Sequence, residues 1–217
     1  MTGQARAVSR QRGENSGTAL AVDTADAAPA HMRRWAYLNP FHFRPGWRIP
    51  VPGSGEFACS VESVWQGLKL VDGATDLAML RRPAAKRPPE AERGNGFDYR
   101  ASVFRFGSDT IDLVTARYLI YLPTYLHLLE RLVPDIVLRE ITDALANGQD
   151  VHFYDWDANF DIEDASASFS HSAVLAAWFG GRLEPDLDRR DRWLAAAGVG
   201  RDDHPLALDR YRRLHSR

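Results

Sequence analysis

The chain has 217 residues, of which 45% are hydrophobic, 26% charged and 11% aromatic, and this composition excludes a wholly disordered protein. Its net charge of -2 excludes a global basic field that would hold nucleic acid or an anionic membrane surface. A single cysteine excludes a disulfide framework, and no apolar run approaches the roughly 20 residues of a membrane helix, so we expect a cytoplasmic protein with no membrane contact.

The N-terminal segment, residues 1–32, consists largely of Gly, Ala, Ser, Thr and Arg and has few side chains to bury. It is therefore predicted to be a disordered tail. Aromatic residues begin abruptly at Trp35, interspersed with prolines, which marks the start of the folded domain that we place at residues 33–185.

The first half of this domain has one clear helix and several weaker signals. Ser60 is a suitable N-cap for a helix that runs to about Val71. Residues 86–96 are rich in Pro and Gly and are predicted to be a loop, and residues 99–106 are predicted to be a strand. Residues 109–122 are predicted to be a helix that is broken or kinked at Pro123.

The second half is predicted to be mostly helical. A helix opens at Pro134 and ends at Asn147-Gly148, a short strand covers 151–154, an acidic loop follows, and a helix covers 171–179. Two Arg-rich helices make a C-terminal extension over 186–217. Because the strands are few, short and irregularly spaced, we predict a helix-dominated α+β fold of one domain.

A narrow polar stripe lies on the helix that Ser60 caps. Glu62, Gln66 and Lys69 fall at i, i+4 and i+7, beside Trp65 at the edge of the apolar face. Of the 27 basic residues only Lys69 and Lys86 are lysine. A lysine retained in an Arg-rich chain indicates a position that needs a compact or deprotonatable amine, although an ordinary solvated face gives the same spacing.

These residues carry a resemblance to a known family. Glu62, Trp65, Gln66 and Lys69 resemble the helix motif of the NADAR (YbiA-like) superfamily, Glu-His-x-Phe-Gln-x-x-Lys. The looser similarities are Pro83-Ala84-Ala85-Lys86-Arg87, Arg117 and the strand with its acidic loop over 151–161. Ser63 stands where the family has His.

The resemblance implies a YbiA-like fold and an N-glycosidase that cleaves the C1′–N bond of a ribosyl or ADP-ribosyl substrate, either a small molecule or nucleic acid, without a cofactor or metal. Glu62 would be the acid/base and Lys69 the amine that attacks C1′. The residues expected to bind substrate are Trp65, Gln66, Lys86, Arg117, Tyr121, Asp155, Asp157 and Asn159. The alternative is a catalytically inactive module of the same fold that binds an ADP-ribose-like nucleotide or a protein.

Two segments keep other interpretations open. Asp155, Asp157, Asn159 and Asp161 alternate like the start of a calcium loop, but Phe160 stands where such a loop needs Gly, which favours a substrate-facing loop or a solvated turn. Arg117 and Tyr121 share a helical face and would clamp a phosphate and stack a base. Equally, tyrosines at this spacing are typical of a core with satisfied hydroxyls.

Overall fold

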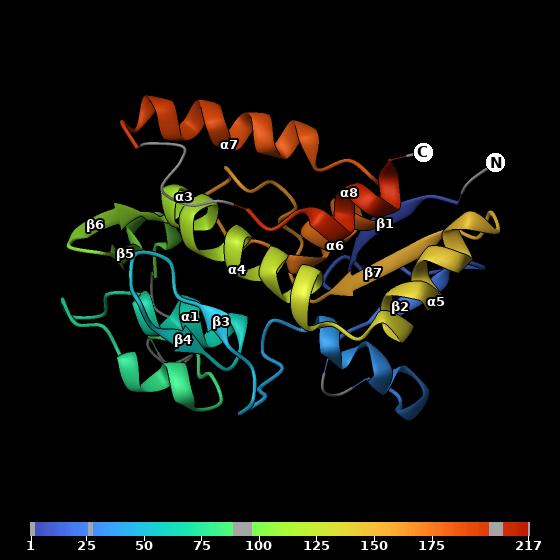
Figure 1. Ribbon diagram of the computed structural model, residues 1–217, viewed down its shortest axis with the longest axis horizontal. Helices are drawn as coiled ribbons and strands as arrows, with labels where there is room; N and C mark the ends of the chain where they lie inside the picture. Colours follow the sequence, from blue (N-terminus) through green and yellow to red (C-terminus); the bar gives the residue numbers. More distant parts are fainter. Residues whose placement is uncertain (1–2, 26–27, 89–96, 200–205, 217) are drawn as a thin grey trace.

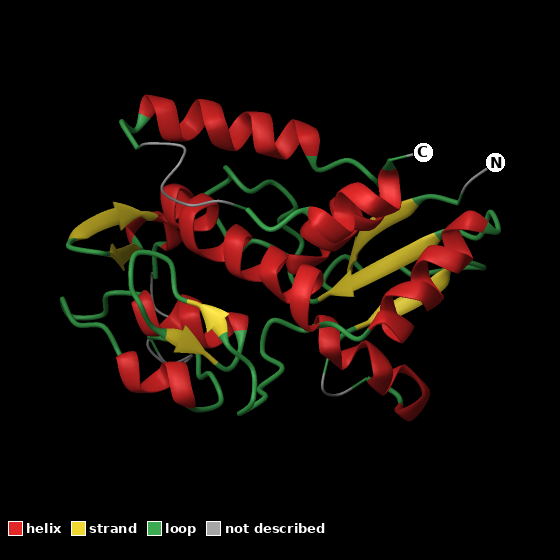
Figure 2. Ribbon diagram, in the orientation of Figure 1, coloured by secondary structure: helices red, strands yellow, loops and turns green. Residues whose placement is uncertain are grey.

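A three-stranded parallel sheet is formed by segments far apart in the chain. The computed structural model describes residues 3–25, 28–88, 97–199 and 206–216. The strand order is β1-β7-β2, with the bounds β1 (Ala5–Ser9), β7 (Val151–Asp155) and β2 (Leu20–Asp23). Val8 is paired with Tyr154 on one side of β7, and Val22 with Phe153 on the other. Figure 2 shows this sheet and two small hairpins among helices, the α+β architecture that the sequence predicts.

The prediction of a disordered tail over residues 1–32 is therefore wrong. Ala5 and Val22 are completely buried, and both strands supply the backbone groups that pair with β7. Neither strand has a partner nearby in sequence, and each is short and only weakly apolar. Their strand structure depends on β7, about 130 residues later in the chain, so local pattern could not reveal it.

A long helical segment crosses the middle of the molecule (Figure 1). Its parts are α3 (Leu113–Ala116), the wide π turns η4 (Arg117–Tyr121), α4 (Leu122–His127) and the π turns η5 (Leu128–Leu132). Pro123 does not break it, because it lies in the first turn of α4, directly after the π turns η4, where a missing N–H is tolerated.

The start of this helix also differs from the prediction. Residues 109–112 form strand β6 (Asp109–Asp112), which is antiparallel to β5 (Val103–Phe106). The predicted strand over 99–106 begins instead with a short 3-10 turn, η3 (Tyr99–Ala101). Asp112 then caps α3, because its carboxylate accepts from the backbone N–H groups of Val114 and Thr115, both at 2.9 Å.

A second layer lies below the long helix in Figure 1. It contains η1 (Ala30–Leu38), the hairpin β3 (Ile49–Pro50) and β4 (Phe57–Ala58), α1 (Val61–Leu68) and η2 (Leu77–Arg81). Ser60 caps α1 as predicted, since its hydroxyl accepts from the Ser63 N–H at 3.0 Å. Most of the loop predicted at 86–96 lies outside the described residues.

Helices α5 (Asp135–Ala146) and α6 (His171–Phe179) pack against the parallel sheet, both close to their predicted bounds. The C-terminal helices are α7 (Glu184–Ala196) and α8 (Asp209–His215). They are not a separate extension from residue 186. Trp193 donates to the Thr115 hydroxyl (2.9 Å), and the buried Glu130 accepts from the Tyr211 N–H (2.8 Å). Both helices therefore belong to the same folded unit.

Within the described part of the chain, no helix combines the length and apolar character needed to cross a bilayer.

Candidate active site

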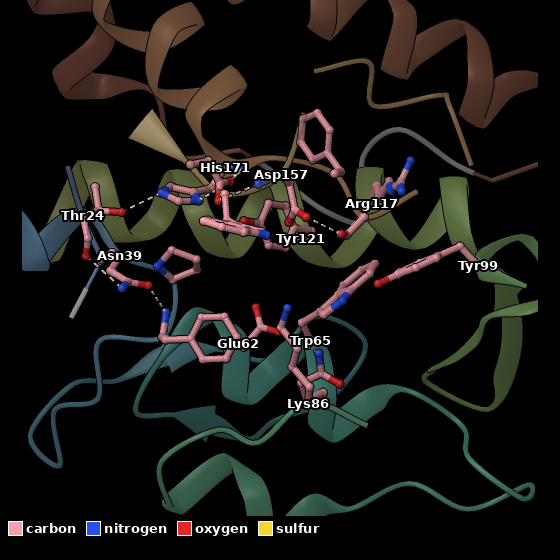
Figure 3. Close-up of a pocket in the computed structure, with 18 of the residues that line it drawn as sticks. Thr24, Asn39, Glu62, Trp65, Lys86, Tyr99, Arg117, Tyr121, Asp157 and His171 are labelled. Atoms are coloured by element: carbon pink, nitrogen blue, oxygen red, sulfur yellow. Dashed lines mark hydrogen bonds and ion pairs between the residues drawn. The ribbon is translucent and has the colours of Figure 1, made fainter. Parts of the chain in front are cut away.

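A pocket of about 310 Å³ lies between α1 and the long helix, where four parts of the chain meet (Figure 3). One wall comes from α1 and the segment after it, with Glu62, Trp65, Gln66, Lys69, Lys86 and Arg87. The facing wall comes from the long helix and from the end of β7 to the start of α6, with Arg117, Tyr121, Asp155, Asp157 and His171. The N-terminal region closes one end with Thr24 and Asn39. A volume at the lower end of the range for small-molecule sites suits a ligand about the size of a nucleoside.

Helix α1 presents its polar stripe to this pocket because its apolar residues face the core. Val61, Val64 and Leu68 are almost completely buried in the main cluster. The rotation that buries them directs Glu62 and Gln66 to the other side of the helix. Trp65 lies between the two faces, with its ring 4.1 Å from that of Phe104 between centroids. It serves both core and pocket.

Glu62 is a buried carboxyl group in the pocket wall, with 6% of its surface exposed. Burial raises its pKa, and the hydrogen bond from the Gln66 amide (2.7 Å) and the charges of Lys69 and Lys86 offset part of that rise. Burial of this kind favours the protonated form, which is the form that acts as a general acid.

Gln66 and Lys69 are tied to the segment that follows α1. The Gln66 side-chain oxygen accepts from the Arg87 N–H at 2.8 Å, so this amide joins Glu62 to residue 87. Nζ of Lys69 donates to the Arg87 carbonyl at 3.1 Å, and this residue is 94% buried. Lys86, by contrast, is exposed at the outer edge of the pocket.

Across the pocket, Asp155 is held at the end of β7 by the start of α6. Its Oδ2 lies 2.8 Å from Nδ1 of His171 and accepts from the Ser170 hydroxyl (2.7 Å) and the His171 N–H (3.1 Å). Burial alone would raise the pKa of Asp155, but the charge and hydrogen bonds of His171 and Ser170 outweigh it and bring the pKa to about 2. Asp155 is therefore an anion at neutral pH.

The stability that this pair contributes is expected to peak between the ordinary pKa values of the two groups, 3.8 and 6.5. The Asp155 contribution is lost as pH falls from 3.8 towards its lowered pKa. The His171 contribution is lost as pH rises from 6.5 through its raised pKa. We expect the difference in free energy of unfolding between the wild type and His171→Gln, from urea titrations, to be larger at pH 5.5 than at pH 3 or pH 9. A difference independent of pH would contradict the pairing.

Asp157 is a second carboxylate on the same wall. It accepts from the Ser168 hydroxyl at 2.8 Å. Burial and the adjacent Asp155 charge raise its pKa, partly offset by that hydrogen bond. Neighbouring carboxylates in unlike surroundings are suited to holding ribose hydroxyls.

Arg117 lines the pocket, but its guanidinium is committed to the protein. Nη1 donates to the carbonyls of Ile162 (2.9 Å) and Asp164 (2.7 Å), and Nη2 donates to that of Ala167 (2.6 Å). Burial lowers its pKa to about 10, so it remains a cation at neutral pH. The predicted phosphate clamp is corrected accordingly: Arg117 holds the acidic loop in place.

Replacing Arg117 with methionine is expected to lower the free energy of unfolding by about 3 kcal/mol, because three loop carbonyls lose their buried donor. Urea denaturation measures this loss, and Arg100→Met, at an exposed arginine near the same loop, is the control. Equal stability of the two variants would show that water replaces the guanidinium.

The tyrosines of the long helix divide between core and pocket. Tyr118 and Tyr125 are completely buried and donate to the Glu163 carboxylate (2.7 Å) and the Leu38 carbonyl (2.6 Å). Tyr121 stacks on Tyr125, its edge meets Trp65, and it also lines the pocket. Burial raises the pKa of Tyr121 well above its ordinary value, so its hydroxyl remains protonated.

Asn159 is the one predicted site residue that does not reach the pocket. Its amide donates to the carbonyls of Asp164 (2.8 Å) and Ala167 (3.2 Å), and its side-chain oxygen accepts from the Asp161 N–H (3.0 Å). Alternation along the acidic loop misled the prediction, because the loop folds back on itself and uses Asn159 internally. Among the described residues, no group of three or more His, Cys, Asp or Glu is arranged to hold a metal ion.

The sequence analysis missed the N-terminal contribution to the pocket. Thr24 and Asn39 both line it, and Arg10 and Asp23 form an ion pair at its edge. Because residues 1–32 are predicted to be a tail, Thr24, Arg10 and Asp23 are not among the predicted site residues. Trp156 is not among them either, and it is 69% exposed at the pocket edge.

Comparison with known proteins gives a family for this chain. No curated protein and no solved structure matches it. One family model matches residues 7–175, a range that includes most of β1, the whole of β2 and the pocket residues on α1, the long helix, β7 and α6. The chain therefore belongs to the family described as "Family of unknown function (DUF6939)".

Proposed function

We propose that the protein is an N-glycosidase that hydrolyses the C1′–N bond of a ribosylated or ADP-ribosylated substrate in the cytoplasm. One observation carries the proposal. Glu62 on α1 and Lys69 at its C-terminal end are far in sequence from the carboxylates Asp155, at the end of β7, and Asp157, yet all four residues line one pocket. The resemblance to the NADAR helix motif implies the roles of acid/base for Glu62 and of attacking amine for Lys69.

Cleavage needs a proton for the departing nitrogen and a group that takes C1′. Glu62, whose pKa is raised by burial, supplies the proton. The neutral Lys69 amine attacks C1′, so that a Nζ–C1′ bond forms as the C1′–N bond breaks and its electron pair leaves with the nitrogen. The extra proton on Nζ then returns to the Glu62 carboxylate, which leaves a neutral Nζ–C1′ adduct. Water then releases the sugar from Lys69.

Positions around the pocket support a ribosyl ligand. Asp157 faces the space between the walls, where a carboxylate accepts hydrogen bonds from sugar hydroxyls (Figure 3). Lys86, exposed at the edge, is available to a phosphate attached to the ribose. The volume fits a base and its ribose inside, with any further part of an ADP-ribosyl group extending outwards.

Ser63 does not weaken the proposal. Its hydroxyl hydrogen-bonds the Ser60 hydroxyl (2.6 Å) and donates to the Arg82 carbonyl (3.1 Å), and it is absent from the pocket lining. The residue in the family's His position therefore lies on another side of α1, so its identity leaves the pocket chemistry unchanged.

The test is release of the free base from ribosylated pyrimidine nucleotides and from ADP-ribosylated nucleic acid, measured by chromatography. The wild type and Arg139→Ala, at an exposed arginine on α5, are expected to release base, and Lys69→Met is expected to release none.

The second candidate is a binding module without activity. It is favoured by the hydrogen bond between Lys69 and the Arg87 carbonyl, because an amine engaged by the protein is less available for attack. Tight ADP-ribose binding without base release by the wild type, lost in Lys69→Met, would establish this function and exclude the glycosidase.

A further inference from the structure

Three side chains from distant segments form a continuous hydrogen-bonded chain on the pocket wall. Asp155 Oδ2 lies 2.8 Å from Nδ1 of His171, and His171 Nε2 lies 2.8 Å from the Thr24 hydroxyl. The three residues come from β7, the start of α6 and the segment after β2. All three line the pocket.

The contact with Asp155 favours the protonated form of His171. Burial alone would lower the pKa of His171, but the Asp155 charge and hydrogen bond, helped by the nearby Asp157, raise it above its ordinary value. A protonated imidazole carries a hydrogen on each ring nitrogen. In this form Nδ1 donates to Asp155, and Nε2 donates to the Thr24 hydroxyl.

The direction of these bonds orients the Thr24 hydroxyl. Because its oxygen accepts from His171, its own hydrogen is directed to another acceptor. The Thr24 backbone is fixed as well, since the Asn39 amide donates to its carbonyl at 2.9 Å. Figure 3 shows Thr24 and His171 across the pocket from Glu62. The pocket thus has proton donors on two of its walls.

We propose that Asp155, His171 and Thr24 form a second proton donor of the site, in which the Thr24 hydroxyl protonates the ribose ring oxygen. This inference rests on the proposed function, because it needs a sugar bound through C1′ to Lys69. Glu62, on the helix that ends directly before Lys69, protonates the departing nitrogen. Thr24 protonates the other heteroatom on C1′, the ring oxygen, from the opposite side of the pocket.

Ring opening of the sugar moves one proton from the Thr24 hydroxyl to O4′. In the sugar–Lys69 adduct the nitrogen lone pair forms a C=N bond to C1′, and the C1′–O4′ bond breaks with its electron pair on O4′. O4′ takes the Thr24 hydroxyl proton, and Thr24 is reprotonated from Nε2 of His171. The product is an iminium on Lys69 with a neutral hydroxyl at C4′ and a neutral imidazole. Water then adds to C1′, and its protons restore His171 and the Lys69 amine as the sugar leaves.

If the three residues only stabilised the fold, their loss would slow base release and ring opening alike. A proton donor for O4′ acts in ring opening, the step that forms the Lys69 imine. The experiment measures two quantities in a single turnover on a ribosylated nucleotide: base released by chromatography, and the Lys69 imine trapped by borohydride and located by mass spectrometry. The variants are Thr24→Val, which removes the hydroxyl at nearly constant shape, and Thr24→Ser, which retains it. Thermal unfolding of both checks the fold.

In Thr24→Val, trapped imine is expected to fall at least about tenfold further than the rate of base release falls. Thr24→Ser is expected to match the wild type in both. The proposed proton donor would be overturned if Thr24→Val lost base release and imine equally or left the imine unchanged. It would also be overturned if Thr24→Ser failed to restore the imine. Base release by a wild type that forms no imine would overturn it while leaving the glycosidase standing, and a wild type that releases no base would overturn both.

Discussion

Glu62→Gln is expected to lower the rate of base release by about 10²- to 10⁴-fold, because glutamine keeps the shape of the side chain but has no proton to give the departing nitrogen. Since the protonated carboxyl is the active form, wild-type activity should fall as pH rises through the raised pKa of Glu62. Rates of base release from pH 4 to 9 measure both effects.

The matched control is Glu56→Gln. Glu56 is an exposed carboxylate whose contact is with Arg81 at 3.2 Å, and it takes no part in the pocket. It should leave both the rate and the pH profile unchanged. A Glu62→Gln variant that retains the alkaline fall in rate would show that another group is the acid.

Deletion of residues 1–24 is expected to abolish cooperative unfolding, because β7 would lose the strands on both of its sides. The completely buried Phe153 of β7 would then be exposed at an unpaired edge. Circular dichroism during thermal unfolding measures the loss. A disordered tail, as the composition of this segment predicts, would be removed without effect.

Two point variants give the same test without shortening the chain. Val22→Asp places an unpaired carboxylate in the core at a completely buried position of β2, whereas Thr18→Asp places the same group at an exposed position between β1 and β2. Val22→Asp is expected to unfold the protein and Thr18→Asp to be neutral. Equal stability would mean that the N-terminal strands are dispensable.

The elements that were predicted correctly carry their own local signals. Helix α1 has a capping serine and an apolar face at helical spacing, α6 follows Ser170 and ends at Gly180-Gly181, and β7 is a short apolar run between turns. Such signals act over one or two turns, so neighbouring residues suffice to reveal them. β1 and β2 lack them, because parallel strands pair only through distant partners.

The same distinction explains the site. Glu62 and Gln66 lie on one helix, and their spacing alone predicts a shared face. The predicted helix continues to about residue 71, but α1 ends at Leu68, and Lys69 is in extended backbone directly after it. The roles of Arg117 and Asn159 depended on where the acidic loop folds back, since both side chains are used by carbonyls of that loop. Thr24 entered the site only because β2 pairs with β7 and brings the following residue to His171.

By itself, the amino-acid sequence determined the α+β class and the shared face of Glu62 and Gln66 on α1, because composition and helical periodicity are local properties. Tertiary structure alone decided that the N-terminal segment is part of the sheet, that Arg117 supports a loop, and that Thr24, His171 and Asp155 form one chain across from Glu62. These contacts join residues up to about 150 positions apart, and packing of the whole chain is what brings them within hydrogen-bonding distance.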